Sequence, residues 1–133
     1  MSREGSLLLA FVLLIATGCG PSGPAPPKTY QVRGKVLFQT DGKPLTAGLV
    51  EFQSTTDANL NGRGELNQEG EYIVQSIFGR TKLEGLAEGT YRVTVVPPQG
   101  PDQTGRPIPL EGTYEVKPDG PNEFTLTIPG KSQ

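Results

Sequence analysis

The sequence predicts an all-β protein, an antiparallel β-sandwich of about seven short strands. Apolar and polar residues alternate with a period of two in several segments, which is typical of strands that bury one face. The 133 residues include 18 glycines and 13 prolines, and turn-forming residues separate the alternating segments. No segment carries the apolar period of a helix of useful length. Short strands divided by turns are the pattern of a sandwich.

The first strands are expected between residues 30 and 53. Residues 30–38 alternate, with Gly34 in mid-strand, where a missing side chain indicates a bulge or a close backbone approach. The turn signal Asp41-Gly42 ends this strand. A second strand is expected over residues 49–53, and residues 55–61 are polar and typical of a loop.

The middle of the chain predicts a hairpin and an irregular stretch. Residues 63–67 and 71–75 are expected to pair around the intervening Gln-Glu-Gly turn, with Tyr72 and Val74 facing inward. Residues 76–89 are expected to be irregular, because their glycines argue against a long helix.

The last third predicts three strands and a loop. Residues 90–96 alternate cleanly and end at a Pro-Pro pair, and residues 99–109 are a proline-rich loop. Two final strands are expected over residues 113–116 and 122–128.

The amino-terminal residues predict export. The apolar run 7–16 is shorter than the about 20 residues that span a bilayer, and with Arg3 before it and small residues after it the run fits a secretory signal. Cys19, the one cysteine of the chain, follows Thr-Gly and resembles the lipobox of bacterial lipoproteins, in which this cysteine is acylated. We therefore expect a signal peptide over residues 1–18 that ends in a lipobox. The alternative is an ordinary secretory signal, cleaved nearby, that leaves a free thiol.

An acylated Cys19 would anchor the chain to a membrane. Residues 19–28 hold this cysteine and a Pro/Gly/Ser linker, which is extended and solvated, and residues 29–133 form the expected β-sandwich domain. In the lipoprotein pattern, an Asp after the cysteine favours retention in the inner membrane, and this chain has Gly20 there. An exported protein anchored in the outer membrane is therefore expected.

Composition excludes several classes of function. With 12 basic and 14 acidic residues, scattered along the chain, no cationic cluster is available for nucleic acid. The chain has no histidine, so neither a Ser-His-Asp nor a Cys-His site is available, and no cofactor is expected. The carboxylates most open to pairing are on outward positions or turns: Glu51, Glu65, Glu71 and Glu115. The sequence thus favours a protein that is not an enzyme.

Three candidate sites were weighed against simpler structural roles. Asp57, Asn59 and Asn61 match the first half of a calcium loop, but Gln68 stands where a bidentate Glu is expected, and a polar loop is the alternative. Lys35 on the first strand and Asn122 on the last are the formal partners of an internal isopeptide bond, although Lys35 alternates toward solvent.

Carbohydrate binding is the third candidate. It generally uses an exposed aromatic platform, and this chain has no tryptophan. The tyrosines are on inward strand positions, so Phe78 is the one aromatic of the expected long loops.

Five short motifs resemble a known family. They are Val-Arg-Gly-Lys-Val at 32–36, Asp-Gly-Lys-Pro-Leu at 41–45, Val-Glu-Phe at 50–52, Gly-Glu-Tyr at 70–72 and Gly-Thr-Tyr-Arg-Val-Thr-Val at 89–95. Together they resemble carboxypeptidase regulatory-like domains. The resemblance implies a transthyretin-like, prealbumin-type sandwich with Ig-like topology. The motifs are strands and turns, so they specify a fold and no activity.

These observations lead to two main functional hypotheses and to a third, a hydrolase, which would require two carboxylates that meet in a cleft and which the alternation does not predict. The first is a non-enzymatic, lipid-anchored cell-envelope protein that acts as a structural or interaction module, with a partner surface on the long loops or on an exposed sheet edge. The alternative is an extracytoplasmic binding module for a glycan or a peptide.

Overall fold

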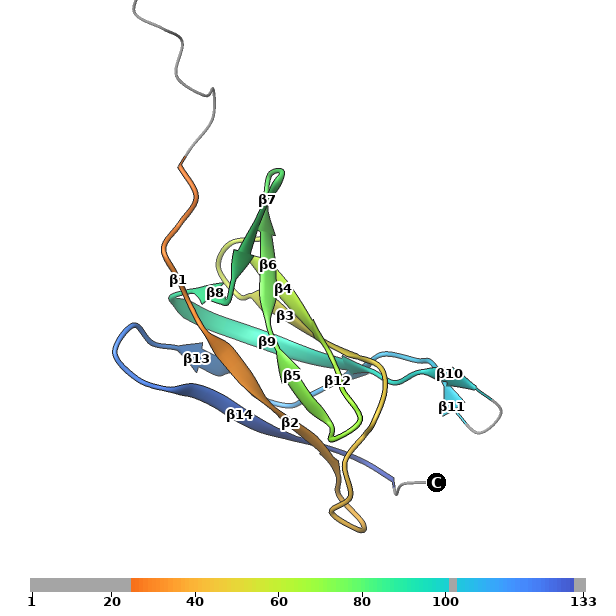
Figure 1. The fold of residues 1–133 in the computed structure, drawn as a ribbon. Helices are drawn as coiled ribbons and strands as arrows, with labels where there is room; N and C mark the ends of the chain where they lie inside the picture. Colours follow the sequence, from red (N-terminus) through yellow and green to blue (C-terminus); the bar gives the residue numbers. More distant parts are fainter. Residues whose placement is uncertain (1–24, 101–102, 131–133) are drawn as a thin grey trace, which may run out of the picture.

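The protein is all-β, as its sequence predicts. The computed structural model describes residues 25–100 and 103–130, and this part of the chain contains strands and turns but no helix, and so none that could cross a membrane (Figure 1). The strands are β1 Thr29–Tyr30, β2 Val32–Phe38, β3 Leu49–Ser54, β4 Asn61–Glu65, β5 Glu71–Ile73, β6 Gln75–Phe78, β7 Thr81–Glu84, β8 Leu86–Ala87, β9 Gly89–Val96, β10 Gln99–Gly100, β11 Gln103–Thr104, β12 Ile108–Pro109, β13 Tyr114–Val116 and β14 Asn122–Ile128.

Two sheets form the sandwich. The large sheet has the order β12-β9-β3-β4-β6-β7, with β13 also paired to β9, and all of its pairs are antiparallel. The small sheet has the order β14-β2-β5. Here β2 and β5 are antiparallel, whereas β14 runs parallel to β2, from Asn122 beside Val32 to Ile128 beside Phe38. The sandwich is therefore antiparallel except where its first long strand meets its last.

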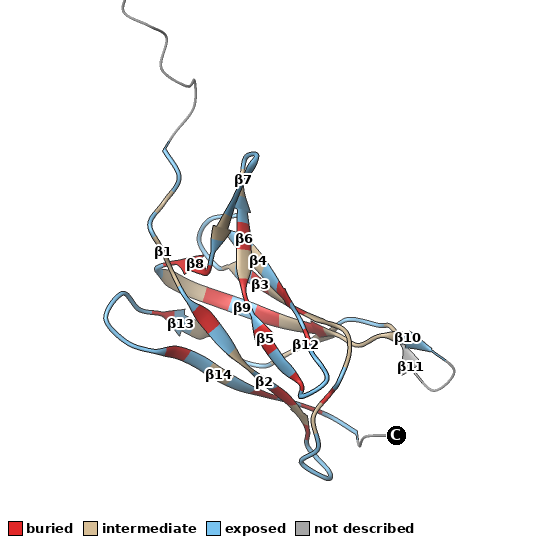
Figure 2. Ribbon diagram, viewed as in Figure 1, coloured by how far each residue is buried: buried red, intermediate tan, exposed pale blue. Residues whose placement is uncertain are grey.

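The core lies between the sheets and follows the predicted alternation. Buried and exposed residues alternate along β2, β3, β9 and β14 (Figure 2). Phe52 is central, with its ring centroid between 6.1 and 6.4 Å from those of Tyr72, Tyr91 and Phe124. Burial of these aromatic and branched side chains is the main stabilising term of such a domain.

Strands β5 and β6 form one bent segment, residues 71–78, that passes from the small sheet to the large one. Its first half pairs with β2 and its second half with β4. The expected hairpin of 63–67 with 71–75 therefore pairs at its two ends, with Arg63 beside Gln75 and the Asn67 N–H donating to the Glu71 carbonyl at 3.0 Å, and is open between them. Gly62 and Gly64 permit this crossing, because a Cβ at either position would lie within 3.0 Å of atoms of the bent segment.

The prediction of an irregular stretch over residues 76–89 was wrong. Strands β6 and β7 form a hairpin that turns at Gly79, whose φ is 61°, and β8 pairs with β1. Short pairs also occur within the expected loop 99–109, where β10 meets β11 and β12 joins β9.

Gly34 has the close backbone approach that its mid-strand position predicts. A Cβ there would overlap the carbonyl oxygen of Phe124 and lie 2.7 Å from the Tyr72 hydroxyl. The Tyr72 side chain crosses β2 at this point and donates a hydrogen bond of 2.8 Å to the Phe124 carbonyl. One glycine thus allows a tyrosine of β5 to tie across the small sheet to β14.

Candidate binding groove

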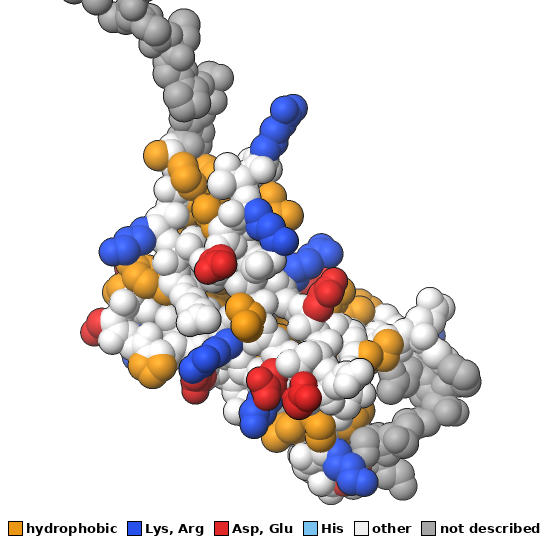
Figure 3. Space-filling model, in the orientation of Figure 1, with side chains coloured by type: hydrophobic (Ala, Val, Ile, Leu, Met, Phe, Trp, Pro, Cys, Tyr) orange, Lys and Arg blue, Asp and Glu red, His pale blue; other side chains and the backbone are white. Residues whose placement is uncertain are grey.

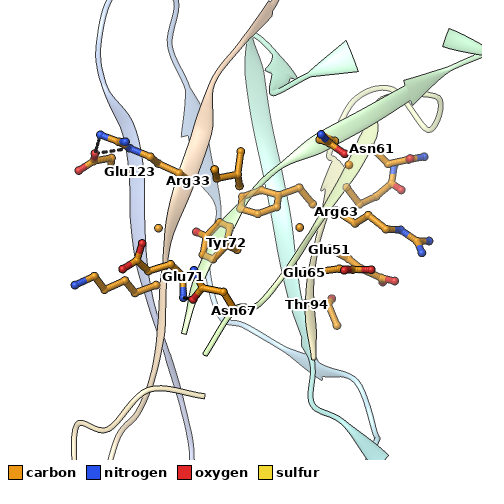
Figure 4. Close-up of a pocket in the computed structure, with 18 of the residues that line it drawn as sticks. Arg33, Glu51, Asn61, Arg63, Glu65, Asn67, Glu71, Tyr72, Thr94 and Glu123 are labelled. Atoms are coloured by element: carbon orange, nitrogen blue, oxygen red, sulfur yellow. Dashed lines mark hydrogen bonds and ion pairs between the residues drawn. The ribbon is translucent and has the colours of Figure 1, made fainter. Parts of the chain in front are cut away.

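A groove with a volume of about 1030 Å³ lies where the bent segment passes from one sheet to the other (Figure 4). Outward-facing side chains of β2, β5 and β14 line one side, and those of β3, β4, β6 and β9 line the other. We call this feature the outer groove.

Strand register places four polar residues in one row across the large sheet. Thr94 of β9 lies opposite Glu51 of β3, Glu51 lies opposite Arg63 of β4, and Arg63 lies opposite Gln75 of β6. Neighbouring strands are about 4.8 Å apart, so the row presents a polar group at every strand. All four side chains line the groove.

Three side chains of this row have no partner among the residues that the structure describes. Among residues 25–100 and 103–130, the side chains of Glu51, Arg63 and Gln75 make no hydrogen bond or ion pair. The other side of the groove differs, because Arg33 Nη2 lies 2.6 Å from Glu123 Oε1 in an ion pair between two half-exposed side chains (Figure 4). The side chains of this row are therefore available to form hydrogen bonds with solvent or with a ligand.

Two isoleucines add apolar surface to the groove. Ile73 is 58% exposed and Ile77 is 62% exposed, and both face outward from the bent segment on either side of Gln75. They are the large hydrophobic side chains most open to solvent in the described chain. Exposed apolar groups beside unpaired polar ones are typical of a binding surface.

Buried aromatic residues close the floor of the groove. Phe52 and Tyr72 line it from below and are 1% and 2% exposed. Burial raises the pKa of the Tyr72 phenol, and the nearby Tyr114 contributes in the same direction. Burial, with a smaller contribution from the charge of Asp57, likewise raises the pKa of Tyr91, which does not line the groove, to about 12. The floor is therefore uncharged at neutral pH.

Of the three calcium-loop residues, Asp57 and Asn59 contact each other, whereas Asn61 belongs to the following strand. The Asp57 carboxylate accepts a hydrogen bond of 2.9 Å from the Asn59 backbone N–H, which stabilises the loop itself. Asn61 begins β4 opposite Gln53 and lines the outer groove. The described residues contain no group of three Asp, Glu, His or Cys side chains that could hold a metal. Calcium binding at this loop stays a prediction.

The isopeptide candidates are not brought together. Lys35 is exposed and lies beside Thr125, three positions along β14 from Asn122. The Asn122 side chain is buried and bonds the backbone of Lys117, accepting from its N–H at 2.8 Å and donating to its carbonyl at 2.9 Å. This geometry gives Asn122 a role in fixing the β13–β14 turn.

The remaining candidate residues are dispersed. Glu51, Glu65 and Glu71 line the outer groove, whereas Glu115 lies on β13 away from it. Phe78 lies at the end of β6, half-buried beside a small cavity that also contacts Leu83 and Leu86, so it is no exposed platform. Cys19 lies outside the described residues.

Sequence reasoning missed the main features of the groove. Arg63, Gln75, Ile73 and Ile77 were not candidates. The available signal was the pair of isoleucines: both occupy outward positions of an alternating segment, where a polar residue is expected.

Comparison with known proteins identifies no family. No protein-family model and no curated protein sequence matches the chain. Solved structures that are similar to it at low identity include the following three. An (S)-allantoin synthase is 16% identical, with a TM-score of 0.46, over 78% of this chain and 42% of its own. A putative carbohydrate binding protein from Pseudomonas aeruginosa is 14% identical, with a TM-score of 0.47, over 81% of this chain and 99% of its own.

A 9R-lipoxygenase from Cyanothece is 13% identical, with a TM-score of 0.40, over 84% of this chain and 18% of its own. The chain therefore spans less than half the length of the synthase and less than a fifth of the lipoxygenase.

Proposed function

We propose that the chain is a non-enzymatic, lipid-anchored protein of the cell envelope, whose folded domain is an interaction module at the membrane surface. The observation that carries the proposal is the short distance in sequence between Cys19 and the first strand. Strand β1 begins at Thr29 and is fastened by its pairing with β8. An extended linker of this length reaches about 30 Å, so an acyl group on Cys19 would hold the domain close to the bilayer.

Binding rather than catalysis fits the chemistry of the chain. It has no histidine, and its one cysteine is assigned to the anchor, so the histidine base and the cysteine nucleophile of acyl-transfer sites are missing. The outer groove supplies unpaired polar side chains on paired strands, which is the property of a rigid recognition surface. The resemblance to carboxypeptidase regulatory-like domains agrees with a module of this kind.

The proposal is tested by the intact mass of the protein extracted from the membrane fraction of its native cells. We expect a mass equal to residues 19–133 plus acyl chains. In Cys19→Ala, this cleaved and acylated species should be undetectable. Ser22→Ala, in the same linker, is the matched control and should change nothing. An unacylated wild-type chain in the soluble fraction would contradict the anchor.

A further inference from the structure

We propose that the outer groove binds a neutral oligosaccharide, with Glu51, Arg63 and Gln75 as its hydrogen-bonding residues and Ile73 and Ile77 as its apolar contacts. The inference rests on the proposed function in one respect only, that the domain is a binding module. It does not require the lipid anchor.

On the large-sheet wall of the groove, recognition must come from side chains. Strand β3 is paired on one side with β4 and on the other with β9, and β4 lies between β3 and β6. Their backbone N–H and C=O groups are therefore largely used within the sheet. A peptide that binds by adding a strand needs a free sheet edge, which the centre of the large sheet does not offer, and β5, the edge strand of the small sheet beside the groove, is only three residues long.

The charges of the groove favour a neutral ligand. Its lining contains equal numbers of basic and acidic residues: Arg33, Lys35, Arg63, Lys82, Glu51, Glu65, Glu71 and Glu123. The two signs are interspersed on the face seen in Figure 3. A phosphate or an acidic polymer requires clustered cations, and a metal ion requires clustered oxygen ligands. Neither arrangement is present among the described lining residues.

The unpaired groups of the row match hydroxyl groups. A sugar hydroxyl both donates and accepts hydrogen bonds. The Glu51 carboxylate accepts, the Arg63 guanidinium donates, and the Gln75 amide does both. Because these three side chains lie on adjacent strands and have no partner in the described chain, they can bond one ligand together without losing an internal contact.

The isoleucines complete the match. A pyranose ring carries its hydroxyls at the edge and exposes C–H groups on its faces. Ile73 and Ile77 are four residues apart on one bent segment, a separation of about 13 Å for a regular strand, with Gln75 between them. Both isoleucines therefore lie at the Gln75 end of the polar row, and two apolar contacts this far apart suit a chain of several sugar units rather than a single one.

The test measures binding of neutral hexasaccharides to the full chain in detergent micelles. The probes are cellohexaose, maltohexaose, mannohexaose and N-acetylchitohexaose, each followed by calorimetry up to about 10 mM, the range of weak specific binding. We expect at least one to bind, and expect Glu51→Gln and Arg63→Gln each to weaken it by about tenfold, because each loses a hydrogen bond to a charged group.

Matched variants outside the groove serve as controls. Glu115→Gln and Arg80→Gln make the same chemical changes at exposed positions that do not line it, and should leave the affinity unchanged. Binding that is equally strong in Glu51→Gln and Arg63→Gln would overturn the proposal. So would the absence of binding by any of the four hexasaccharides. A soluble, unacylated chain that binds a hexasaccharide would instead contradict the anchor and leave this inference standing.

Discussion

The two faces of the bent segment 71–78 use polar groups in opposite ways. On the inner face, the Tyr72 hydroxyl donates to the Phe124 carbonyl at 2.8 Å, and the Ser76 hydroxyl donates to the Gly85 carbonyl at 2.9 Å. On the outer face, the Gln75 side chain has no hydrogen-bond partner within the described chain and stands between two exposed isoleucines. The same segment therefore has hydrogen-bonded polar side chains on its inner face and a polar side chain without a protein partner on its outer face.

The difference separates stability from binding. A buried polar group must be hydrogen-bonded, because leaving it unpaired costs its full desolvation energy. An exposed polar group is solvated in both the folded and the unfolded state, so it adds little to the free energy of unfolding. Inner-face substitutions should therefore lower stability, and outer-face substitutions should change only what the groove binds.

The largest effect is expected from Gly34→Ala. The added Cβ would overlap the Phe124 carbonyl oxygen and crowd the Tyr72 hydroxyl, so β2 and β14 would have to separate at their centre. We expect the free energy of unfolding to fall by at least about 3 kcal/mol, the upper range for overpacking a core. Urea unfolding followed by circular dichroism measures it. Gly120→Ala, where a Cβ meets nothing within 4 Å, is the control and should be close to neutral.

The next largest effect is alkaline destabilisation by Tyr91. Its folded-state pKa, about 12, lies above the unfolded value near 10, so the stabilisation is complete below pH 10 and is lost as the pH rises toward 12. From Tyr91 alone, the free energy of unfolding should fall by about 1.4 kcal/mol between pH 8 and pH 11. The raised pKa of Tyr72 adds a loss of the same sign.

Tyr91→Phe isolates this contribution. The variant keeps the ring and removes the titrating hydroxyl, which donates a 2.8 Å hydrogen bond to the Ala87 carbonyl. The difference in unfolding free energy between wild type and variant should shrink from pH 8 to pH 11. Parallel pH profiles for the two proteins would contradict a raised Tyr91 pKa.

A smaller effect is expected from Tyr72→Phe. The ring still packs against Phe52, and only the hydrogen bond to the Phe124 carbonyl is lost. A single buried hydrogen bond contributes about 1 kcal/mol, so the free energy of unfolding should fall by that amount. A loss as large as that of Gly34→Ala would mean that the hydroxyl, rather than the backbone approach at Gly34, holds β14 to β2.

The core could be predicted from the sequence, whereas the crossing between sheets could not. Val50, Phe52 and Val93 are each followed by a polar residue at the next position, so their inward direction follows from local pattern alone. The pairing of β5 with β2 and of β6 with β4 depends on contacts between distant segments and on the absence of side chains at Gly62 and Gly64. The alternation of residues within one segment does not predict which distant strand that segment pairs with.

The β6–β7 hairpin and the groove were missed for related reasons. Strand β7 has only Leu83 partly buried, so an edge strand of this kind shows no apolar alternation. The row of Glu51, Arg63 and Gln75 exists only once three strands are in register, and each residue alone is an ordinary solvent-facing position. The parallel β2–β14 pair was likewise beyond local pattern, because it joins the two ends of the domain.

The smallest effects are expected on the outer face, and they are the sharpest test of the comparison. Arg63→Gln removes a guanidinium that has no partner in the described chain, and Glu123→Gln breaks the ion pair with Arg33, whose two side chains are 57% and 54% exposed. Each should change the free energy of unfolding by less than about 0.5 kcal/mol. Urea unfolding at low salt measures both. If Arg63→Gln instead lowers the free energy of unfolding as much as Tyr72→Phe does, the outer row stabilises the fold, and the argument that its side chains serve to bind a ligand fails.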